Sequence, residues 1–184
     1  QIACFEGTDR LDGFRLSPDG TRLAISLGLE LFIVPFDEAA LKTARTREGL
    51  VAMQNSCLYN QAAVKDMRWS RDGKFMTVIF RDTAAALNDA MRVFDVSRCP
   101  PADPVRRDDF PTGRFTVNGY KNSPLLPSFS WDGDSRFLFT DVVRLEGFGN
   151  LYFYDMKTQK GERINPIEGA CCYRNATFSP DGTH

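Results

Sequence analysis

The sequence is nearly without histidine and lacks several common catalytic motifs. Its 184 residues include one histidine, His184, so a Ser-His-Asp triad or a histidine-based zinc site lacks its base or its ligand. A Gly-x-Ser-x-Gly elbow, a Gly-x-Gly-x-x-Gly fingerprint and a glycine-rich phosphate loop are also missing from the sequence. We therefore expect no catalytic residue, no metal site and no cofactor within this chain.

The chain also lacks an excess of charge of either sign and any long apolar run. It has 23 basic and 24 acidic side chains, a net charge of -1, which provides no overall field for nucleic acid or an anionic membrane. Its apolar runs, such as residues 31–36, fall far short of the roughly 20 residues that span a bilayer. We expect neither nucleic-acid binding nor membrane insertion.

Cysteine is present without the spacing of a metal or redox motif. The five cysteines are Cys4, Cys57, Cys99, Cys171 and Cys172. The absence of a Cys-x-x-Cys pair argues against a structural zinc site or a thioredoxin-type centre. One disulfide between loops stays possible if the compartment is oxidising.

The first residues have neither the basic nor the apolar region of a signal peptide.

What the chain does have is an internal repeat. An apolar residue followed by Ser-x-Asp-Gly occurs four times, at residues 16–20, 69–73, 129–133 and 178–182. Its serines, Ser17, Ser70, Ser130 and Ser179, are 49 to 60 residues apart. A fixed period of this order indicates a repeat architecture in which each repeat is one structural unit.

Each copy of the motif is followed by the same order of elements. The motif is a turn, because Pro, Asp and Gly suit successive turn positions and Gly accepts a positive φ. Apolar runs follow at residues 23–26, 75–80 and 137–140, and again at 31–34, 91–94 and 151–154. Their β-branched and aromatic residues predict strands, and their continuous apolar character indicates burial on both faces. Residues 161–165 fit a more polar outer strand, and we expect helix only within residues 38–49 or 84–90.

The motif residues are predicted to have structural roles. The turn residues are Asp19, Gly20, Asp72, Gly73, Asp132, Gly133, Asp181 and Gly182. Each second run of apolar residues ends in an aromatic-Asp pair, at Phe36-Asp37, Phe94-Asp95 and Tyr154-Asp155. Asp132-Gly133-Asp134 lacks the remaining ligand spacing of a calcium loop.

The repeated Ser-Pro-Asp-Gly-Thr turn followed by an apolar strand resembles the TolB-like, WD-repeat-related β-propellers. The resemblance implies an all-β fold of about three four-stranded antiparallel blades, with partial strands at both ends. It implies the tail of a preceding blade at residues 1–11, blades at 12–63, 64–119 and 120–170, and the start of another blade at 171–184. It also implies a bacterial extracytoplasmic location, periplasmic or secreted.

Several functions are compatible with this repeat, because fold does not fix function. The first is a non-catalytic scaffold that binds another protein or a peptide. In such a scaffold the chain would also contact the remaining blades of its propeller. The second is the gating propeller of a prolyl-oligopeptidase-like serine peptidase whose catalytic domain lies outside this chain. The third is metal-dependent sugar or lactone chemistry in a central channel, for which the sequence assigns no ligands.

A binding surface is predicted on one rim of the propeller. Loops that join second to third strands, or one blade to the next, emerge there, and Tyr and Arg are common interface anchors. The candidate binding residues are Tyr59, Arg81, Asp82, Tyr120, Arg144, Tyr173 and Arg174. At about 54 residues a blade, even four blades would need roughly 216 residues. We therefore expect an open arc whose end faces expose apolar surface.

Overall fold

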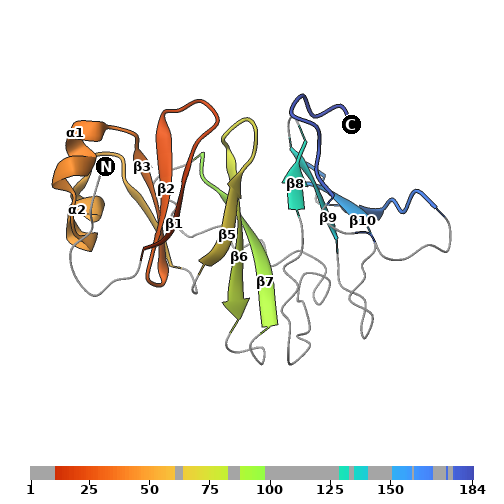
Figure 1. The fold of residues 1–184 in the computed structure, drawn as a ribbon, viewed down its shortest axis with the longest axis horizontal. Coiled ribbons are helices and arrows are strands. Elements are labelled where there is room, and N and C mark those ends of the chain that lie inside the picture. Colours follow the sequence, from red (N-terminus) through yellow and green to blue (C-terminus); the bar gives the residue numbers. More distant parts are fainter. Residues whose placement is uncertain are drawn as a thin grey trace.

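The computed structural model describes residues 11–60, 64–82, 88–97, 129–132, 135–140, 151–158, 160–167, 173 and 176–184. These residues form three antiparallel sheets that stand side by side in chain order (Figure 1). The first sheet contains β1 (Leu11–Leu16), β2 (Arg22–Leu27), β3 (Glu30–Pro35) and β4 (Cys57–Asn60). The second contains β5 (Val64–Trp69), β6 (Phe75–Asp82) and β7 (Asn88–Asp95), and the third contains β8 (Phe129–Trp131), β9 (Arg136–Thr140), β10 (Leu151–Asp155) and β11 (Lys160–Arg163). The nearly all-β prediction is confirmed.

The observed strands coincide with the predicted apolar runs. The runs after the motif turns lie in β2, β6 and β9, and the second runs lie in β3, β7 and β10. Residues 160–163 form β11, the outer strand of the third sheet. Strands are added across each sheet in chain order, from β1 to β4, from β5 to β7 and from β8 to β11. Each strand that precedes a motif turn, namely β1, β5 or β8, therefore lies at one edge of its sheet.

Two short helices lie between β3 and β4. They are α1 (Glu38–Thr43) and α2 (Arg47–Ala52). Asp37 caps α1 by accepting hydrogen bonds from the backbone N–H groups of Ala39 and Ala40, and Thr46 caps α2 by accepting one from Gly49. Helix within residues 38–49 is thus confirmed, but α2 continues beyond this range to Ala52. The alternative at 84–90 is wrong at residues 88–90, which belong to β7, while 84–87 lie outside the described residues.

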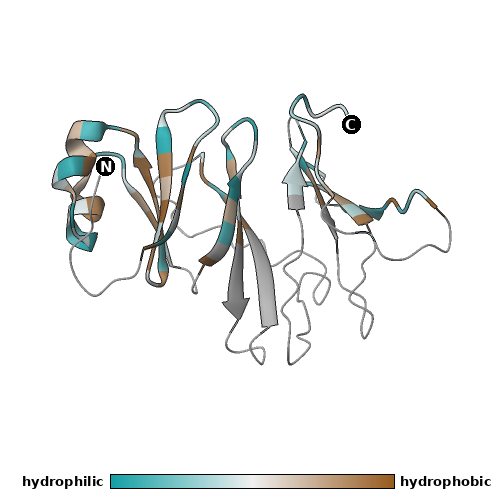
Figure 2. Ribbon diagram, viewed as in Figure 1, coloured by the Kyte–Doolittle hydropathy of each residue, from teal (hydrophilic) through white to brown (hydrophobic). Residues whose placement is uncertain are grey.

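Apolar side chains fill the space between neighbouring layers, and Figure 2 marks the hydrophobic residues in brown along the ribbon. One core lies between the first and second sheets, a second between the second and third sheets, and a third between the first sheet and the helices. Met76, Phe94 and Phe137 are among the fully buried side chains of these cores. Burial on both faces explains why these strands read as continuous apolar runs rather than alternating ones.

A tryptophan at the end of an edge strand joins each pair of sheets. Trp69 Nε1 donates to the backbone oxygen of Arg15 over 3.0 Å, and the Arg22 guanidinium lies over the Trp69 ring, 4.9 Å from its centroid. Trp131 Nε1 donates to Thr77 Oγ1 over 2.8 Å, and Phe75 stacks on the Trp131 ring. Arg22 and Phe75 each begin the second strand of their sheet. In both sheets, the first residue of the second strand therefore packs onto the tryptophan of the following sheet.

Candidate functional site

The Ser-x-Asp-Gly motif forms a hydrogen-bonded turn. Ser17 Oγ donates to Asp19 Oδ1 over 2.6 Å, the Thr21 N–H donates to the same carboxylate over 3.1 Å, and the Arg22 N–H donates to Ser17 Oγ over 2.9 Å. The equivalent hydrogen bonds recur around Ser70 and Asp72, and around Ser179 and Asp181. Gly20, Gly73 and Gly182 have positive φ values of 72°, 70° and 74°. Gly133 lies outside the described residues.

These hydrogen bonds favour the charged form of the motif aspartates. The Ser17 hydroxyl and the Thr21 N–H lower the pKa of Asp19 to about 2, and Ser179 and Thr183 do the same for Asp181. For Asp72, burial acts to raise the pKa, but hydrogen bonds from Ser70 and Lys74 outweigh it and leave the pKa lowered. Each shift has a cause within the turn itself.

The third copy of the motif is shifted relative to the sequence alignment. Ser130 lies within β8, opposite Leu138, and not at the start of the turn. Asp132 occupies the position of Ser17 and Ser70, because its N–H donates to the backbone oxygen of Arg136 and its Oδ1 accepts from the Arg136 N–H. Asp132 is buried and also pairs with the Arg136 guanidinium over 2.6 Å. It is a turn residue as predicted, but it replaces the serine.

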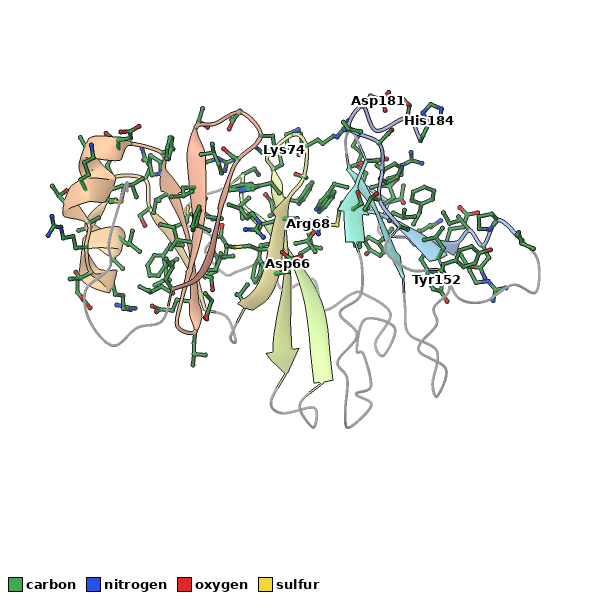
Figure 3. The ribbon with its side chains drawn as sticks, in the orientation of Figure 1. Asp66, Arg68, Lys74, Tyr152, Asp181 and His184 are labelled. Atoms are coloured by element: carbon green, nitrogen blue, oxygen red, sulfur yellow. The ribbon has the colours of Figure 1, made fainter. Side chains whose placement is uncertain are left out.

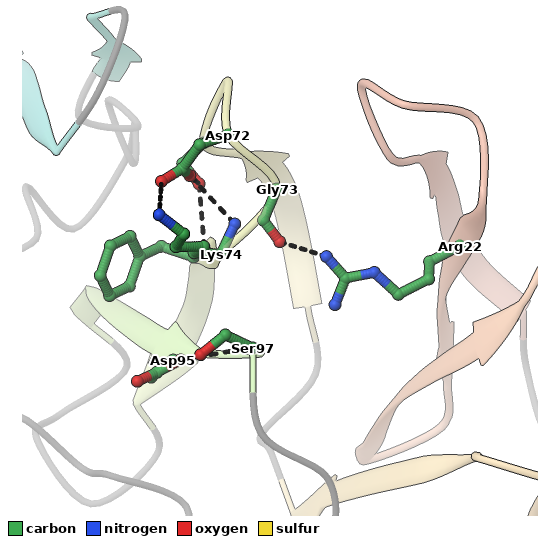
Figure 4. A network of polar contacts seen from close by, with 8 residues as sticks. Arg22, Asp72, Gly73, Lys74, Asp95 and Ser97 are labelled. Carbon is green, nitrogen blue, oxygen red and sulfur yellow. Dashed lines mark hydrogen bonds and ion pairs between the residues drawn. The ribbon is translucent and has the colours of Figure 1, made fainter.

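Charged side chains on the rim formed by these turns contact their own turn or a neighbouring one (Figure 4). Arg22 Nη1 donates to the backbone oxygen of Val96 over 2.7 Å, and Nη2 donates to that of Gly73. Lys74 Nζ lies 3.3 Å from Asp72 Oδ2, within the same turn. Figure 3 shows Lys74 beside this turn, and Asp181 and His184 at the neighbouring turn near the end of the chain. This rim therefore connects the sheets through its polar groups.

The prediction for Tyr59 on the opposite rim is wrong. Tyr59 lies in β4, opposite Leu31, and its buried ring meets the Phe94 ring edge-on at 5.2 Å. Burial, followed by the nearby Asp95 charge, raises the pKa of Tyr59 to about 12. Residues 57–60 form the fourth strand of the first sheet, so this tyrosine contributes to the core and does not face solvent.

The remaining rim residues are brought together only in part. Arg81 and Asp82 were expected in a loop but are the last residues of β6, opposite Asp89 and Asn88. The half-buried Tyr173 accepts a hydrogen bond at its hydroxyl from the Ile167 N–H over 3.2 Å. Tyr120, Arg144 and Arg174 lie outside the described residues. The structure therefore leaves the predicted binding role of this rim untested.

Two kinds of residue have positions or roles that the sequence did not predict. Leu29, in the turn between β2 and β3, is 65% exposed at the rim where second and third strands join. The closing aspartates cap the backbone just after them: Asp95 accepts from the Ser97 N–H, and Asp155 accepts from the Lys157 and Thr158 N–H groups. The recurrence of these aspartates after an aromatic residue was a sequence signal that could have identified their capping role. An isolated leucine in a turn gives no such signal.

Cys57 is disulfide-bonded. The residue is buried in β4, within the core between the first and second sheets. The other four cysteines of the chain lie outside the described residues. The chain therefore has a disulfide, but at Cys57 it joins a strand and not a loop as the sequence suggested.

Two absences hold for the described residues alone. Among them, no three His, Cys, Asp or Glu side chains form a group that could hold a metal ion. No helix in this part of the chain is long and apolar enough to cross a membrane.

No family model matches the sequence, and no curated protein matches it. Solved β-propeller structures do match the fold. A protein described as TolB from Agrobacterium tumefaciens has a TM-score of 0.50 and 14% identity, over 97% of this chain and 53% of that one. The β-propeller domain of the Trilobed protease from Pyrococcus furiosus has a TM-score of 0.52 and 11% identity, over 89% and 44%. Hydrazine synthase from Kuenenia stuttgartiensis has a TM-score of 0.54 and 13% identity, over 97% and 49%.

The fold of this chain is therefore that of a β-propeller, as the repeat predicted. The chain spans about half the length of the solved structures it matches. At identities of 11–14% the likeness concerns the fold alone.

Proposed function

We propose that this chain is part of a non-catalytic β-propeller that binds another protein or a peptide. The observation that carries the proposal is the use of the motif carboxylates. Asp19, Asp72 and Asp181 each accept one hydrogen bond from a serine hydroxyl and one from a backbone N–H. These hydrogen bonds account for the lowered pKa values of the three carboxyl groups. Groups held in this way stabilise turns and are poor proton donors at neutral pH. The repeated chemistry of the chain is that of a scaffold.

We place the partner on the rim opposite the motif turns. The motif rim already uses Arg22 and Lys74 in contacts within and between turns. The opposite rim carries the exposed Leu29, and it is the rim on which the sequence predicts binding loops. Binding residues are concentrated on loops that a rigid scaffold positions. Tyr and Arg, which the sequence predicts in these loops, are enriched at protein interfaces.

The disulfide at Cys57 supports an oxidising compartment, consistent with a periplasmic or secreted protein. The test is the thiol state of Cys57 in protein alkylated at the moment of lysis, followed by peptide mass spectrometry without reductant. A Cys57 thiol fully alkylated before reduction would contradict the extracytoplasmic location.

The binding role is tested by capture from an extract of the source organism, with chemical cross-linking and mass spectrometry. We compare the wild type with Leu29→Ser, with Arg174→Ala, and with Val51→Ser as a control on α2, where the side chain is also exposed. We expect at least one protein that the first two variants lose and the control retains. If every captured protein is retained equally by all three variants, the rim is not the binding surface.

The second candidate is the gating propeller of a prolyl-oligopeptidase-like peptidase. It is favoured by the likeness to the propeller domain of a protease from Pyrococcus furiosus. The full-length protein decides between the two. Labelling by a fluorophosphonate probe, at a serine within a Gly-x-Ser-x-Gly elbow outside this chain, would favour the gating domain.

A further inference from the structure

Cys57, the first residue of β4, is one half of a disulfide. It lies opposite Ile33, is buried, and belongs to the core between the first and second sheets. Its side chain therefore faces the second sheet, and the partner cysteine has to reach that interface. The sequence contains four possible partners, which are Cys4, Cys99, Cys171 and Cys172.

The end of β7 lies across the interface from Cys57. Tyr59, two residues further along β4, meets the Phe94 ring of β7 edge-on at 5.2 Å. β7 runs toward the rim of the motif turns, and β4 runs away from it because it is antiparallel to β3. Two residues toward this rim lead from Tyr59 to Cys57 and from Phe94 to Val96. Val96 is buried in the same core as Cys57, so the two residues lie at one level of the interface.

Polar contacts fix the chain where it leaves β7. Arg22 of the first sheet donates from Nη1 to the Val96 backbone oxygen over 2.7 Å, and the Val96 N–H donates to the Lys74 backbone oxygen over 2.8 Å. Asp95 Oδ1 then accepts from the Ser97 N–H over 3.0 Å and from the Ser97 hydroxyl over 2.5 Å (Figure 4). The chain is therefore held at the first sheet as far as Ser97.

Cys99 is only two residues beyond Ser97. An extended chain advances by at most about 3.6 Å per residue, so the Cα atoms of Ser97 and Cys99 are within roughly 7 Å of each other. The Cα atoms of two disulfide-bonded cysteines are themselves about 4–7 Å apart. The tether is therefore long enough for Cys99 to meet Cys57 and too short to carry it to another sheet.

The first sheet shows which way the chain turns after this point. Phe36 is the equivalent of Val96, because its N–H donates to the Thr21 backbone oxygen as the Val96 N–H donates in the second sheet. After Phe36 the chain enters α1 and α2, which pack on the face of the first sheet that is turned away from the second (Figure 1).

The equivalent face of the second sheet is the one that meets Cys57. Ile25 of β2 and Val78 of β6 correspond by register. Ile25 packs in the core that contains the helices, whereas Val78 packs in the core that contains Cys57. A chain that covers Ile25 after leaving the first sheet would cover Val78 after leaving the second. The repeat therefore directs the segment after Val96 toward Cys57.

Two of the other cysteines are tied by the chain to the third sheet. Cys171 and Cys172 directly precede Tyr173, whose hydroxyl accepts from the Ile167 N–H beyond the end of β11. The second sheet lies between the third sheet and Cys57, and stacked sheets are about 10 Å apart. Two such spacings exceed the separation of the Cα atoms in a disulfide.

Cys4 approaches from the wrong edge of the first sheet. It precedes Leu11, the first residue of β1, by seven residues. β1 and β4 are the two edges of this sheet, three strand spacings or about 14 Å apart. A segment from β1 would reach the side chain of Cys57 through the packed core between the sheets, where Met67 is buried. Cys99 needs no such path.

We propose that Cys57 and Cys99 form the disulfide, and that it fastens the chain leaving the second sheet to the outer strand of the first. The bond joins residues 42 apart in the sequence and acts as a redox-dependent clasp between two neighbouring sheets. It is independent of the binding surface proposed on the rim.

The clasp closes by thiol–disulfide exchange with an external disulfide such as oxidised glutathione. One protein thiolate attacks the glutathione disulfide and releases one glutathione thiol. The second protein thiolate attacks the resulting mixed disulfide and releases the other. Two protein thiols are thus oxidised to one disulfide while one glutathione disulfide is reduced to two thiols.

The test maps the disulfides of the wild-type protein folded with reduced and oxidised glutathione. Free thiols are blocked with N-ethylmaleimide, and the protein is digested with trypsin without reductant and analysed by mass spectrometry. Cleavage separates the candidates, with Cys57 in residues 48–65, Cys99 in 99–106, Cys4 in 1–10, and Cys171 with Cys172 in 164–174. We expect residues 48–65 linked to residues 99–106, and loss of this linked pair on reduction.

Two variants test the same pairing. Cys99→Ala should leave the Cys57 thiol free, so that residues 48–65 carry N-ethylmaleimide when the protein is blocked in denaturant. Cys4→Ala is the matched control and should retain the linked pair. Reductant should lower the thermal midpoint of the wild type by roughly 5–15 °C, and it should lower the midpoint of Cys99→Ala by less.

The proposal is overturned if Cys57 is linked to residues 1–10 or 164–174, or if its thiol is free in the oxidised wild type. It is also overturned if reductant lowers the midpoints of the wild type and Cys99→Ala equally. None of these results affects the rim proposal, which is read from captured proteins.

Discussion

Replacing Thr77 with valine removes the one side chain that accepts the Trp131 indole hydrogen bond between the second and third sheets. Thr77 is fully buried in β6, and its Oγ1 lies 2.8 Å from Trp131 Nε1. Valine has nearly the same shape, so the change opens little cavity. It leaves a buried N–H group without its acceptor, which costs about 1–3 kcal/mol. We therefore expect Thr77→Val to lower the free energy of unfolding by about 2 kcal/mol.

Urea denaturation measures this loss. With an m-value of about 2 kcal/mol/M, a loss of about 2 kcal/mol lowers the unfolding midpoint by about 1 M at unchanged slope. Thr43→Val is the matched control, because Thr43 is exposed and its hydroxyl donates only to the Ala40 backbone oxygen of its own helix. The control should lie within about 0.5 kcal/mol of the wild type.

A double-mutant cycle with Trp131→Phe isolates the hydrogen bond. Phenylalanine retains an aromatic ring to stack on Phe75 but has no indole N–H. Thr77→Val should therefore cost much less in the Trp131→Phe background, with a coupling energy of about 1 kcal/mol or more. An equal cost in both backgrounds would refute the reasoning, since the effect would then not pass through this bond.

Four further experiments test other parts of the structure. Tyr59→Phe should raise the free energy of unfolding by about 1 kcal/mol in urea denaturation, because it removes a buried hydroxyl that has no hydrogen-bond partner; a loss of stability would contradict this. Gly20→Ala should lower the free energy of unfolding by about 1–2 kcal/mol, because Gly20 has a positive φ. Gly73→Ala should lower it further, because its added Cβ would lie 3.2 Å from Arg22 Nη2. Thermal melts that show the larger loss for Gly20→Ala would be inconsistent with these contacts. The pKa of Asp19 is lowered from 3.8 to about 2, so its charged form contributes stability above about pH 4 that is lost as the pH falls toward 2. Melts across this range should show a smaller loss for Asp19→Asn than for the wild type, and identical curves would exclude the contribution. Reduction should lower the thermal midpoint through loss of the Cys57 disulfide, which contributes about 2–4 kcal/mol in typical cases. Reduction should lower the midpoint of Cys57→Ser by less than that of the wild type, and an equal drop in both would contradict a contribution from this disulfide.

The strands could be predicted because their signals are local. A turn motif followed by an apolar run depends only on neighbouring residues, and it recurs in β2, β6 and β9. Polar residues at the end of a strand carry no such signal. Arg81 and Asp82 therefore read as loop residues, although cross-strand pairing extends β6 through both of them.

The alignment of the third motif shows where pattern matching stops. Phe129-Ser130-Trp131-Asp132-Gly133 satisfies the motif as well as the other copies. The pairing of Trp131 with Phe137 and the bond from the Asp132 N–H to Arg136 move the turn two residues further along. Aspartate and serine both accept a backbone N–H, so the residue types alone did not separate the two alignments.

The candidate site was harder to predict than the fold, because exposure depends on packing between distant segments. Tyr59 reads as a loop anchor in sequence, yet the second sheet covers it. Phe14 reads as an ordinary strand residue, yet it is exposed because the helices cover only the other strands of that face. Leu11 and Leu16 of β1 are exposed on the same face of the sheet as Phe14.

Hydroxyl-radical footprinting read by mass spectrometry tests the face-to-face packing of the first two sheets. Met67 and Trp69 are the more reactive side chains, but they are buried between the sheets, whereas Phe14 and Leu16, at the same register positions of the first sheet, are exposed. We predict oxidation of Phe14 and Leu16 in the folded protein, with Met67 and Trp69 protected until it unfolds. Oxidation of Met67 and Trp69 at their unfolded rates in the folded protein would contradict the face-to-face packing of the first two sheets.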